Sequence, residues 1–309
     1  MTDTPGFSLV DVCLICSCLI WGFNSTAVKY SLGEFSPLAF NAVRFSLASV
    51  TILLIALYVE KDLRVERRDL LRIVGIGFLG NTLYQVLFIN GINLSTAGNT
   101  TLVLAMMPVS IAILGRLFAY EHIPLVGWAG IAVSFTGVLI VTLSGQQSID
   151  LFSTTLKGDL LTLAGVFCFS SYTLLCKPLL KRYSPLKLTA IAMASGSLFL
   201  VIYSLPAVTR QDWLSASPLA WAGLVYSFSL SLVFAYIVWN WGVSKLGSTR
   251  TAVYQNLTTI SGVLASWLVL GEPWTPMKFF GALLTLGGLA AVRAADIIRL
   301  RAAKRRHAA

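Results

Sequence analysis

The chain has 309 residues and a formal net charge of +10, and 56% of its residues are hydrophobic while only 12% are charged. A soluble domain carries roughly 25% charged residues, so this composition excludes an ordinary soluble protein. Acidic residues are absent from the long segments 70–120 and 160–211. Most of the surface of this chain is therefore expected to face lipid.

The five cysteines lie in apolar segments, and their spacing predicts neither a disulfide nor a metal site. Cys13 and Cys16 have the spacing of a metal-binding pair, but no second pair and no histidine cluster completes it. The first apolar segment is also too long, and its N-terminal flank too poor in basic residues, for a cleaved signal peptide. We expect no metal and no cofactor.

Ten apolar segments separated by turn signals predict an all-α membrane protein. A spanning helix needs about 20 mainly apolar residues. Proline stands at or near the start of several segments, where a missing backbone N–H does not weaken a helix. The predicted spans are 9–30, 37–59, 70–92, 97–119, 124–144, 158–177, 185–206, 218–241, 249–270 and 276–295.

The basic residues are distributed unequally between the two sides of the predicted membrane. With ten spans, both termini lie on one side, which carries 18 lysines and arginines against 4 on the other. This bias predicts that both termini are cytoplasmic. We interpret the positive charge as an orientation signal beside anionic lipid, and not as a nucleic-acid site.

The sequence repeats itself across its two halves. When the first half is shifted by 148 residues, Asp11 coincides with Asp159 and the Ser-Pro-Leu at 36–38 coincides with that at 184–186. After a shift of 151 residues, the further matches are Gly91 with Gly242, Glu121 with Glu272, and Gly137 with Gly288. Two halves of five spans each (1–149 and 150–296) are therefore predicted, followed by a basic cytoplasmic tail (297–309). Because five is odd, the second half is inverted, which is typical of alternating-access transporters with a central site between the repeats.

Three long segments resemble a known family. They are WGFNSTAVKYSLGEFSPLAFNAVRFSLA from residue 21, AGNTTLVLAMMPVSIAILGRLFAYEHIPLVGWAGIAVSFTGVLIV from residue 97 and GSTRTAVYQNLTTISGVLASWLVLGEPWTPMKFFGALLTLGGLAAV from residue 247. Over residues 9–295 the chain resembles the EamA branch of the drug/metabolite transporter superfamily, and it is similar to bacterial amino-acid exporters of the YddG type. The resemblance implies a ten-helix basket in the bacterial inner membrane that exports amino acids, aromatic ones included.

Polar and aromatic side chains follow helical spacing within several spans, for example Asn81, Tyr84, Gln85 and Phe88 in 70–92. A side-chain amide in hydrocarbon is unfavourable without a partner, so we expect such stripes to face a shared cavity. Bonding between helices is the alternative explanation, and Trp239 could equally belong to an interfacial belt. Amides, hydroxyls and aromatic rings without a midspan acid suit a small neutral or zwitterionic solute. The candidate substrate-binding residues are Trp21, Asn24, Asn81, Tyr84, Asn99, Phe169, Tyr172, Tyr236, Trp239 and Gln255.

Arg44 is the single charged residue well inside a predicted span. An ionisable group at such a position is a candidate functional residue, which would attract a substrate carboxylate or hold a gate. Snorkelling to the outer surface or pairing with Glu34 are the simpler alternatives. The family resemblance implies an arginine here among carriers of varied substrates, which favours an architectural role. The equivalent residue in the second repeat is Ala192, so the charge occurs in one copy only.

Pro108 lies in the middle of the span 97–119, where it removes the hydrogen bond to the carbonyl of Leu104. We expect a kink there, which serves either as a hinge or as a fixed bend. The equivalent residue in the second repeat is Thr259, so the span 249–270 should be straighter at that point.

These patterns predict a secondary carrier that works by alternating access, and the family resemblance implies that it exports amino acids from a bacterial cytoplasm. A carrier of the same fold for another small metabolite or drug is the first alternative, and a channel is another. An enzyme is disfavoured, because His122 and His307 lie on the predicted cytoplasmic side and no acidic pair faces a cavity. No Asp, Glu or His lies deep within a span, which favours facilitated diffusion or exchange over proton coupling. The sequence leaves the oligomeric state open.

Overall fold

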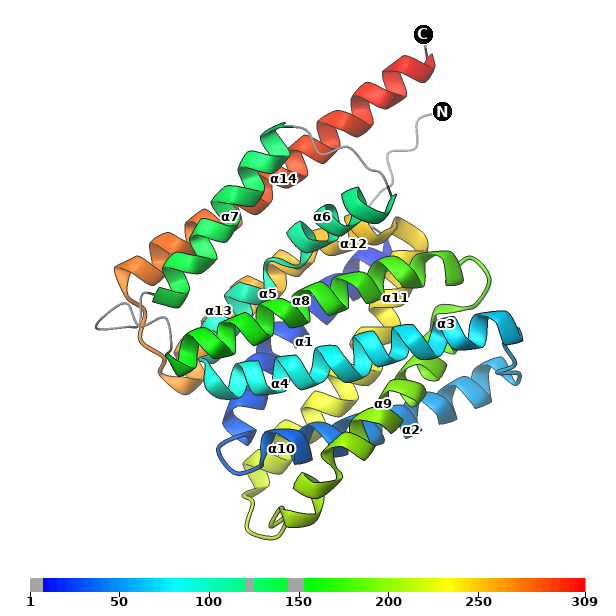
Figure 1. Ribbon diagram of the computed structural model, residues 1–309, viewed down its shortest axis with the longest axis vertical. Coiled ribbons are helices and arrows are strands. Elements are labelled where there is room, and N and C mark those ends of the chain that lie inside the picture. Colours follow the sequence, from blue (N-terminus) through cyan, green and yellow to red (C-terminus); the bar gives the residue numbers. More distant parts are fainter. Residues whose placement is uncertain (1–7, 120–124, 144–152, 309) are drawn as a thin grey trace.

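The computed structural model describes residues 8–119, 125–143 and 153–308, and every regular element among them is a helix (Figure 1). Glu121, His122 and Pro124 lie outside the described residues. Seven helical segments are long and apolar enough to cross a membrane, and three shorter apolar helices complete the ten predicted spans. The prediction of an all-α membrane protein is confirmed.

The first repeat contains spans 1 to 5. Span 1 is α1 (Leu9–Ser31), and span 2 is α2 (Pro37–Glu60). Span 3 consists of α3 (Arg67–Gly77), the π-helix η1 (Phe78–Leu83) and α4 (Tyr84–Leu94). Span 4 consists of α5 (Ala97–Leu104) and α6 (Met107–Ala119), and span 5 is α7 (Leu125–Leu143).

The second repeat contains spans 6 to 10. Span 6 is α8 (Thr154–Leu179), and span 7 is α9 (Pro185–Arg210). Span 8 consists of α10 (Pro218–Tyr226), the π-helix η2 (Ser227–Phe234) and α11 (Ala235–Leu246). Span 9 consists of α12 (Ser248–Val253) and α13 (Gln255–Leu270), and span 10 is α14 (Pro276–Ala308). The predicted tail 297–309 is therefore helical as far as Ala308, as the continuation of α14.

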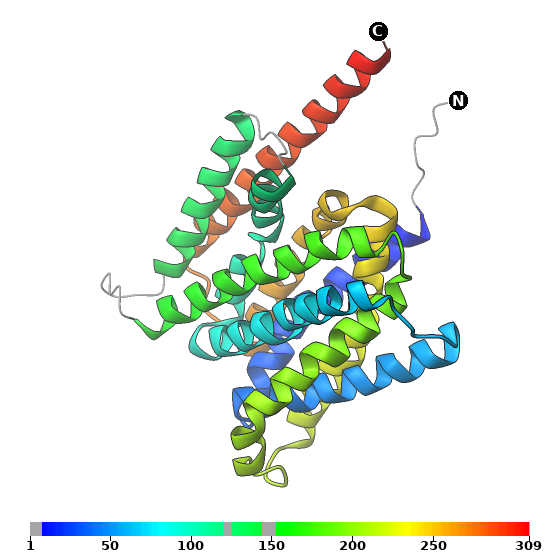
Figure 2. The same cartoon turned by 45° about the vertical axis from the view of Figure 1, so that its right-hand side comes forward.

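The helices pack in pairs that repeat about a pseudo-two-fold axis (Figures 1 and 2). The two pairs α2–α9 and α7–α14 each join the same helix of the two repeats. Helix α1 packs on spans 8 and 9, and correspondingly α8 packs on spans 3 and 4. Each repeat thus buries its helices against the other repeat, which places the centre of the molecule between them.

The α7–α14 pair is held at very short range by glycines. A Cβ atom added to Gly137 would lie 2.5 Å from the backbone oxygen of Gly281, and one added to Gly288 would lie 2.5 Å from that of Gly130. Ser134 donates a hydrogen bond to the backbone oxygen of Thr285 at 2.9 Å in the same contact. Small residues allow this approach of two backbones, as is common between helices in membranes.

Spans 3 and 8 are interrupted by π-helices at equivalent places. Residues 78–83 correspond, after the shift of 151, to residues 229–234, which lie inside η2. Such segments displace the hydrogen-bond ladder and occur often at functional sites. Nothing in the sequence pattern predicted them.

Spans 4 and 9 are also interrupted. Span 4 breaks at Ala105 and Met106, just before Pro108, as the missing proline N–H predicts. Helix α13 is continuous through Thr259, as expected, but span 9 breaks earlier, at Tyr254. The second interruption was not predicted, because no proline marks it.

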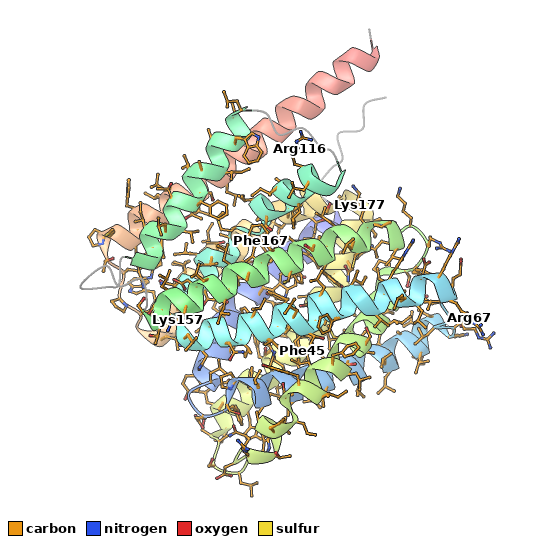
Figure 3. The ribbon with its side chains drawn as sticks, viewed as in Figure 1. Phe45, Arg67, Arg116, Lys157, Phe167 and Lys177 are labelled. Carbon is orange, nitrogen blue, oxygen red and sulfur yellow. The ribbon has the colours of Figure 1, made fainter. Side chains whose placement is uncertain are left out.

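The side of the molecule at which α1 begins and α14 ends is called the terminal face here. Arg67, Arg116 and Lys177 lie toward this face, and Lys157 lies toward the opposite face (Figure 3). These positions agree with the sides on which the charge count placed the four residues. That the terminal face is cytoplasmic stays a prediction.

Candidate functional site

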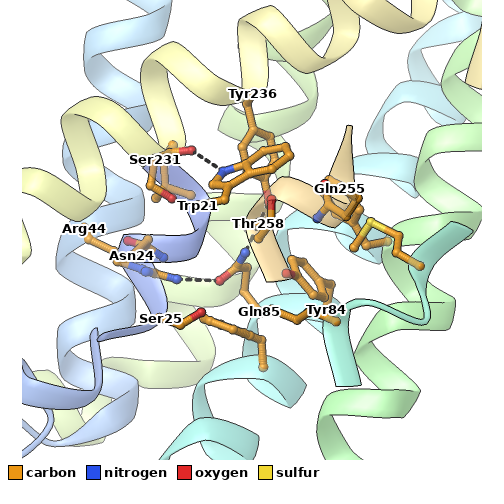
Figure 4. Close-up of a pocket in the computed structure, with 15 residues that line it drawn as sticks. Trp21, Asn24, Ser25, Arg44, Tyr84, Gln85, Ser231, Tyr236, Gln255 and Thr258 are labelled. Carbon is orange, nitrogen blue, oxygen red and sulfur yellow. Dashed lines mark hydrogen bonds between the residues drawn. The ribbon is translucent and has the colours of Figure 1, made fainter. Parts of the chain in front are cut away.

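A cavity of about 40 Å³ lies between the two repeats, close to the middle of the spans (Figure 4). Its walls come from spans 1, 2, 3, 4, 6, 8 and 9. The 15 lining residues are Trp21, Asn24, Ser25, Arg44, Tyr84, Gln85, Phe88, Leu104, Met107, Phe169, Ser231, Leu232, Tyr236, Gln255 and Thr258. All are buried except Trp21, which is half-buried.

The lining follows the internal repeat. Four pairs of equivalent residues contribute both members to it, namely Trp21 with Phe169, Gln85 with Tyr236, Leu104 with Gln255, and Met107 with Thr258. The pseudo-two-fold axis therefore passes through the cavity. The chemistry is nevertheless unequal across the axis, since Gln255 and Thr258 of span 9 are polar where span 4 offers Leu104 and Met107.

Aromatic rings form one wall of the cavity, and Phe169 is at their centre. Its ring centroid lies 5.0 Å from that of Tyr84, 5.7 Å from that of Tyr236 and 6.2 Å from that of Trp21. The indole Nε1 of Trp21 donates a hydrogen bond to the backbone oxygen of Ser231 at 2.9 Å. Ser231 lies in η2, so Trp21 joins span 1 to the displaced backbone of span 8.

Arg44 forms the charged part of the lining. It donates from Nε to Asn41 Oδ1 (2.9 Å), from Nη1 to Ser227 Oγ (2.6 Å) and from Nη2 to Gln85 Oε1 (2.7 Å). Its guanidinium carbon also lies 5.6 to 5.9 Å from the ring centroids of Phe40, Phe45 and Phe88. These contacts come from α2 itself and from spans 3 and 8.

The position of Arg44 excludes two of the alternatives left by the sequence. The side chain is 1% exposed, so it does not snorkel to the surface. Its partner is not Glu34, whose carboxylate accepts hydrogen bonds from the backbone N–H and the hydroxyl of Ser217. Arg44 instead faces the interior, between the two repeats.

The predicted site residues divide into two groups. Those that line the cavity are Trp21, Asn24, Arg44, Tyr84, Phe169, Tyr236 and Gln255. Those that the structure places elsewhere are Asn81, Asn99, Pro108, Tyr172 and Trp239. None of these five residues lines the cavity, so the structure gives no support for a direct contact between them and a substrate.

Tyr172 and Trp239 form a layer behind Phe169, with ring centroids 5.4 Å and 6.0 Å from it. The hydroxyl of Tyr172 accepts a hydrogen bond from Asn240 (2.9 Å), and Trp239 donates one to Thr173 (3.3 Å). Both rings are completely buried, so Trp239 is not an interfacial belt residue. Their position indicates that they support the aromatic wall.

The two predicted asparagines outside the lining lie in different places. Asn99 begins span 4 near the face opposite to the termini, and its amide donates to Asp159 Oδ2 at 3.3 Å. Asn81 is buried inside η1, one turn before the lining residues Tyr84 and Gln85. The π-helix changes which side of span 3 faces the cavity, so the stripe predicted from regular helical spacing was only partly correct.

Eight lining residues were not among the candidates: Ser25, Gln85, Phe88, Leu104, Met107, Ser231, Leu232 and Thr258. Gln85 and Phe88 share the helical stripe of Tyr84, so the pattern contained them. Leu104 is the repeat equivalent of the candidate Gln255, and this symmetry was the available signal for it. Leu232 and Ser231 lie in η2, whose irregular backbone no sequence pattern announced.

Ion pairs link the two repeats at the terminal face. Arg182 forms ion pairs with Glu66 and Asp69, and the hydroxyl of Tyr183 donates to Asp69 at 2.8 Å. The Arg182 guanidinium holds the pKa of the Glu66 carboxyl below its usual range. These bonds link the connection between spans 2 and 3 with the connection between spans 6 and 7, so they hold the two repeats together at this face.

Hydrogen bonds also join helix ends at the opposite face. Lys29 donates to the backbone oxygens of Ile92 (2.9 Å), Asn93 (3.0 Å) and Ser95 (2.6 Å) at the end of span 3. Glu272 accepts from the backbone N–H groups of Ala97 and Gly98, which begin span 4. The cavity has room for roughly three water molecules. A larger solute needs the surrounding side chains or helices to move apart.

Comparison with known proteins agrees with this architecture. Uncharacterized transporter YyaM of Bacillus subtilis (strain 168) is 28% identical over 282 residues, which cover 90% of this chain and 91% of that protein. The "Probable terminal-alkyne amino-acid exporter" of Streptantibioticus cattleyicolor is 26% identical over 293 residues, which cover 94% of this chain and 95% of that protein. A solved crystal structure aligns with a TM-score of 0.68 at 16% identity, over 94% of this chain and 98% of that one, which supports the fold alone.

The sequence profile of the EamA-like transporter family matches the chain twice, over residues 8–143 and 156–294. The two matches coincide with the five-span repeats that pack about the central cavity. The chain is therefore a multi-pass membrane transporter, and not an enzyme, and it belongs to the EamA-like transporter family.

Proposed function

We propose that this protein exports amino acids, aromatic and other neutral ones, from a bacterial cytoplasm across the inner membrane. It works by alternating access, as a facilitator or exchanger. The terminal face is the cytoplasmic one in this proposal, as the distribution of basic residues suggests. The similarity to a probable terminal-alkyne amino-acid exporter supports the same substrate class.

The observation that carries the proposal is the combination of groups around the central cavity. The lining combines one guanidinium, from Arg44, with the side-chain amides of Asn24, Gln85 and Gln255, and no carboxylate is present among the 15 lining residues. A zwitterion needs donors for its carboxylate and acceptors or aromatic faces for its ammonium. The Oδ1 atom of Asn24 is buried without a hydrogen-bond partner among the described residues, so it is available as an acceptor.

The aromatic wall adds the second part of the argument. The rings of Trp21, Tyr84 and Tyr236 all contact the ring of Phe169, and together they offer an aromatic surface against which a ring or apolar side chain would pack. In Figure 4, Arg44 and Asn24 lie at one end of the site, and Gln255 lies at the other. Polar groups at both ends, with aromatic rings in the lining, suit a solute that combines charged groups with an apolar part.

The test is a counterflow assay with the purified protein in liposomes. Vesicles loaded with unlabelled phenylalanine should accumulate labelled phenylalanine, tryptophan and leucine transiently, while a labelled nucleoside and a cationic dye should not enter. Uptake of the nucleoside or the dye, with no amino-acid counterflow, would contradict the proposal. Protein-free vesicles measure the leak.

A further inference from the structure

The guanidinium of Arg44 is neutralised by no acidic group among the described residues. Its hydrogen bonds go to the neutral side chains of Asn41, Gln85 and Ser227, although the group is almost completely buried. Hydrogen bonds satisfy the donors, but a buried charge without an opposite charge stays electrostatically unfavourable. The positive charge of Arg44 would therefore stabilise an anion placed beside it.

The same hydrogen bonds connect the two repeats. Asn41 lies on α2 with Arg44, Gln85 lies in span 3 directly after η1, and Ser227 is the first residue of η2 in span 8. Gln85 also donates to the hydroxyl of Tyr236 in span 8 at 3.2 Å. Arg44 thus connects span 2 to both spans that carry π-helices, one in each repeat. The hydrogen bonds from Arg44 to Gln85 and Ser227 are called the tie here.

We propose that a carboxylate of the substrate replaces Gln85 and Ser227 as the partner of Arg44, and that substrate binding thereby releases span 8 from span 2. The hydrogen bond from Asn41 Nδ2 to the backbone oxygen of Gln85 (3.1 Å) keeps span 3 attached to span 2. A carboxylate binds a guanidinium through two parallel charge-assisted hydrogen bonds, which are stronger than bonds to neutral oxygens. Arg44 remains bonded to Asn41 of its own helix, which keeps its side chain in place. The guanidinium of Arg44 then both binds the substrate and connects the two repeats.

This exchange of partners affects whether the protein works as a facilitator or as an exchanger. A ligand changes a conformational equilibrium only through different interactions with the two states. Without substrate, the carrier keeps the tie and reorients slowly between its inward-facing and outward-facing states. With substrate bound, the tie is lost and the carrier reorients faster. The protein is then an exchanger of small carboxylates, in which solute on the far side accelerates flux. This inference rests on the proposed central site and adds its charge requirement and its transport mode.

The experiment uses three ligands that differ in one charged group: phenylalanine, phenethylamine without the carboxylate, and 3-phenylpropionate without the ammonium. Binding to the purified protein is measured by intrinsic fluorescence, and labelled flux is measured in liposomes with and without unlabelled ligand inside. We expect the two carboxylates to bind more tightly than phenethylamine, by on the order of ten- to a hundredfold. Flux of a carboxylate should rise several-fold when the ligand is present on the far side.

Three variants connect the result to the proposed residues. Arg44→Gln should abolish the preference for carboxylates, and Arg44→Lys should restore part of it because the positive charge returns. Ser227→Ala removes one bond of the tie and leaves the charge, so it should raise flux into empty acceptors and lower the acceleration by far-side ligand. Ser229→Ala is the matched control, since it lies in the same π-helix and its hydroxyl bonds only to its own helix at Val225.

The outcomes separate this inference from the proposed function. Arg44-dependent binding of 3-phenylpropionate without binding of phenylalanine would support carboxylate binding by Arg44 and contradict amino-acid export. Transport of phenylalanine with equal affinity for phenethylamine, unchanged in a monodisperse Arg44→Gln protein, would overturn carboxylate binding by Arg44 and leave the proposed function standing. Identical flux ratios in Ser227→Ala and wild type would overturn the tie.

Discussion

Trp21 and Phe169 occupy equivalent positions in the two repeats, 148 residues apart, and their rings meet edge to face with centroids 6.2 Å apart. The pseudo-two-fold axis of the molecule therefore runs between two rings that line the cavity. A solute at this point touches both repeats at once, which couples its binding to their relative position. Trp21 differs from Phe169 in one respect, because its indole N–H also bonds to the backbone of η2.

Replacing Trp21 by alanine should weaken the binding of aromatic substrates about two- to tenfold, because an aromatic contact contributes roughly 0.5–1.5 kcal/mol beyond area burial. Trp21→Phe keeps a ring and should recover part of this loss. The measurement is the apparent affinity at matched amounts of protein in the membrane. Trp267→Ala is the control, since that side chain is exposed on the outer surface of the helices. Unchanged affinity in a well-expressed Trp21→Ala protein would remove this ring from the substrate site.

A reporter fused after Ala309 should be cytoplasmic, because the terminal side of the membrane carries most of the lysines and arginines. Leu214, which is 98% exposed, follows span 7 on the opposite face, and Lys61 is exposed on the terminal face. In intact cells a membrane-impermeant maleimide should label Leu214→Cys and not Lys61→Cys, relative to the background of the five native cysteines. Labelling of Lys61→Cys from outside would reverse the orientation of the whole chain.

Flux should need no ion gradient. The cavity lining contains no Asp, Glu or His, and an arginine stays protonated at working pH, so the 15 lining residues offer no group at which proton and substrate compete. Liposomes with labelled substrate outside, unlabelled substrate inside and no ion gradient should show substantial flux of the label, unchanged when a pH difference is dissipated. The contrary result is accumulation against the substrate gradient, driven by an imposed pH difference and abolished by a protonophore.

Gly281→Ala should destabilise the protein, because the new Cβ atom would lie 2.8 Å from the backbone oxygen of Gly137 on the facing helix. Overpacking of this kind costs about 1–3 kcal/mol of unfolding free energy. The thermal midpoint of the purified protein in detergent should fall accordingly. Gly287→Ala on the same helix α14 is the matched control, since no heavy atom lies within 4 Å of its added Cβ and alanine favours a helix. Equal midpoints for the two variants would show that the α7–α14 contact tolerates the extra atom.

The sequence by itself determined the ten spans, the class of protein and the internal repeat. These properties depend on the hydropathy of 20-residue segments and on matches at fixed offsets, which need no knowledge of packing. The same information identified Trp21, Tyr84 and Phe169 as cavity residues and Arg44 as an unusual buried charge. Proline chemistry also located the break in span 4 before Pro108.

Only the tertiary structure decided which side of each helix faces the cavity. Tyr172 and Trp239 satisfied the same pattern as Phe169, yet their rings lie behind it. The pattern could not separate them, because a ring enclosed by other helices and a ring beside a cavity have the same spacing in the sequence. Asn81 lies outside the lining, although it shares the stripe of Gln85, since η1 alters the rotation per residue that the pattern assumed. The partners of Arg44 come from spans 2, 3 and 8, and a contact between residues up to 183 positions apart depends on how the repeats pack and not on local sequence.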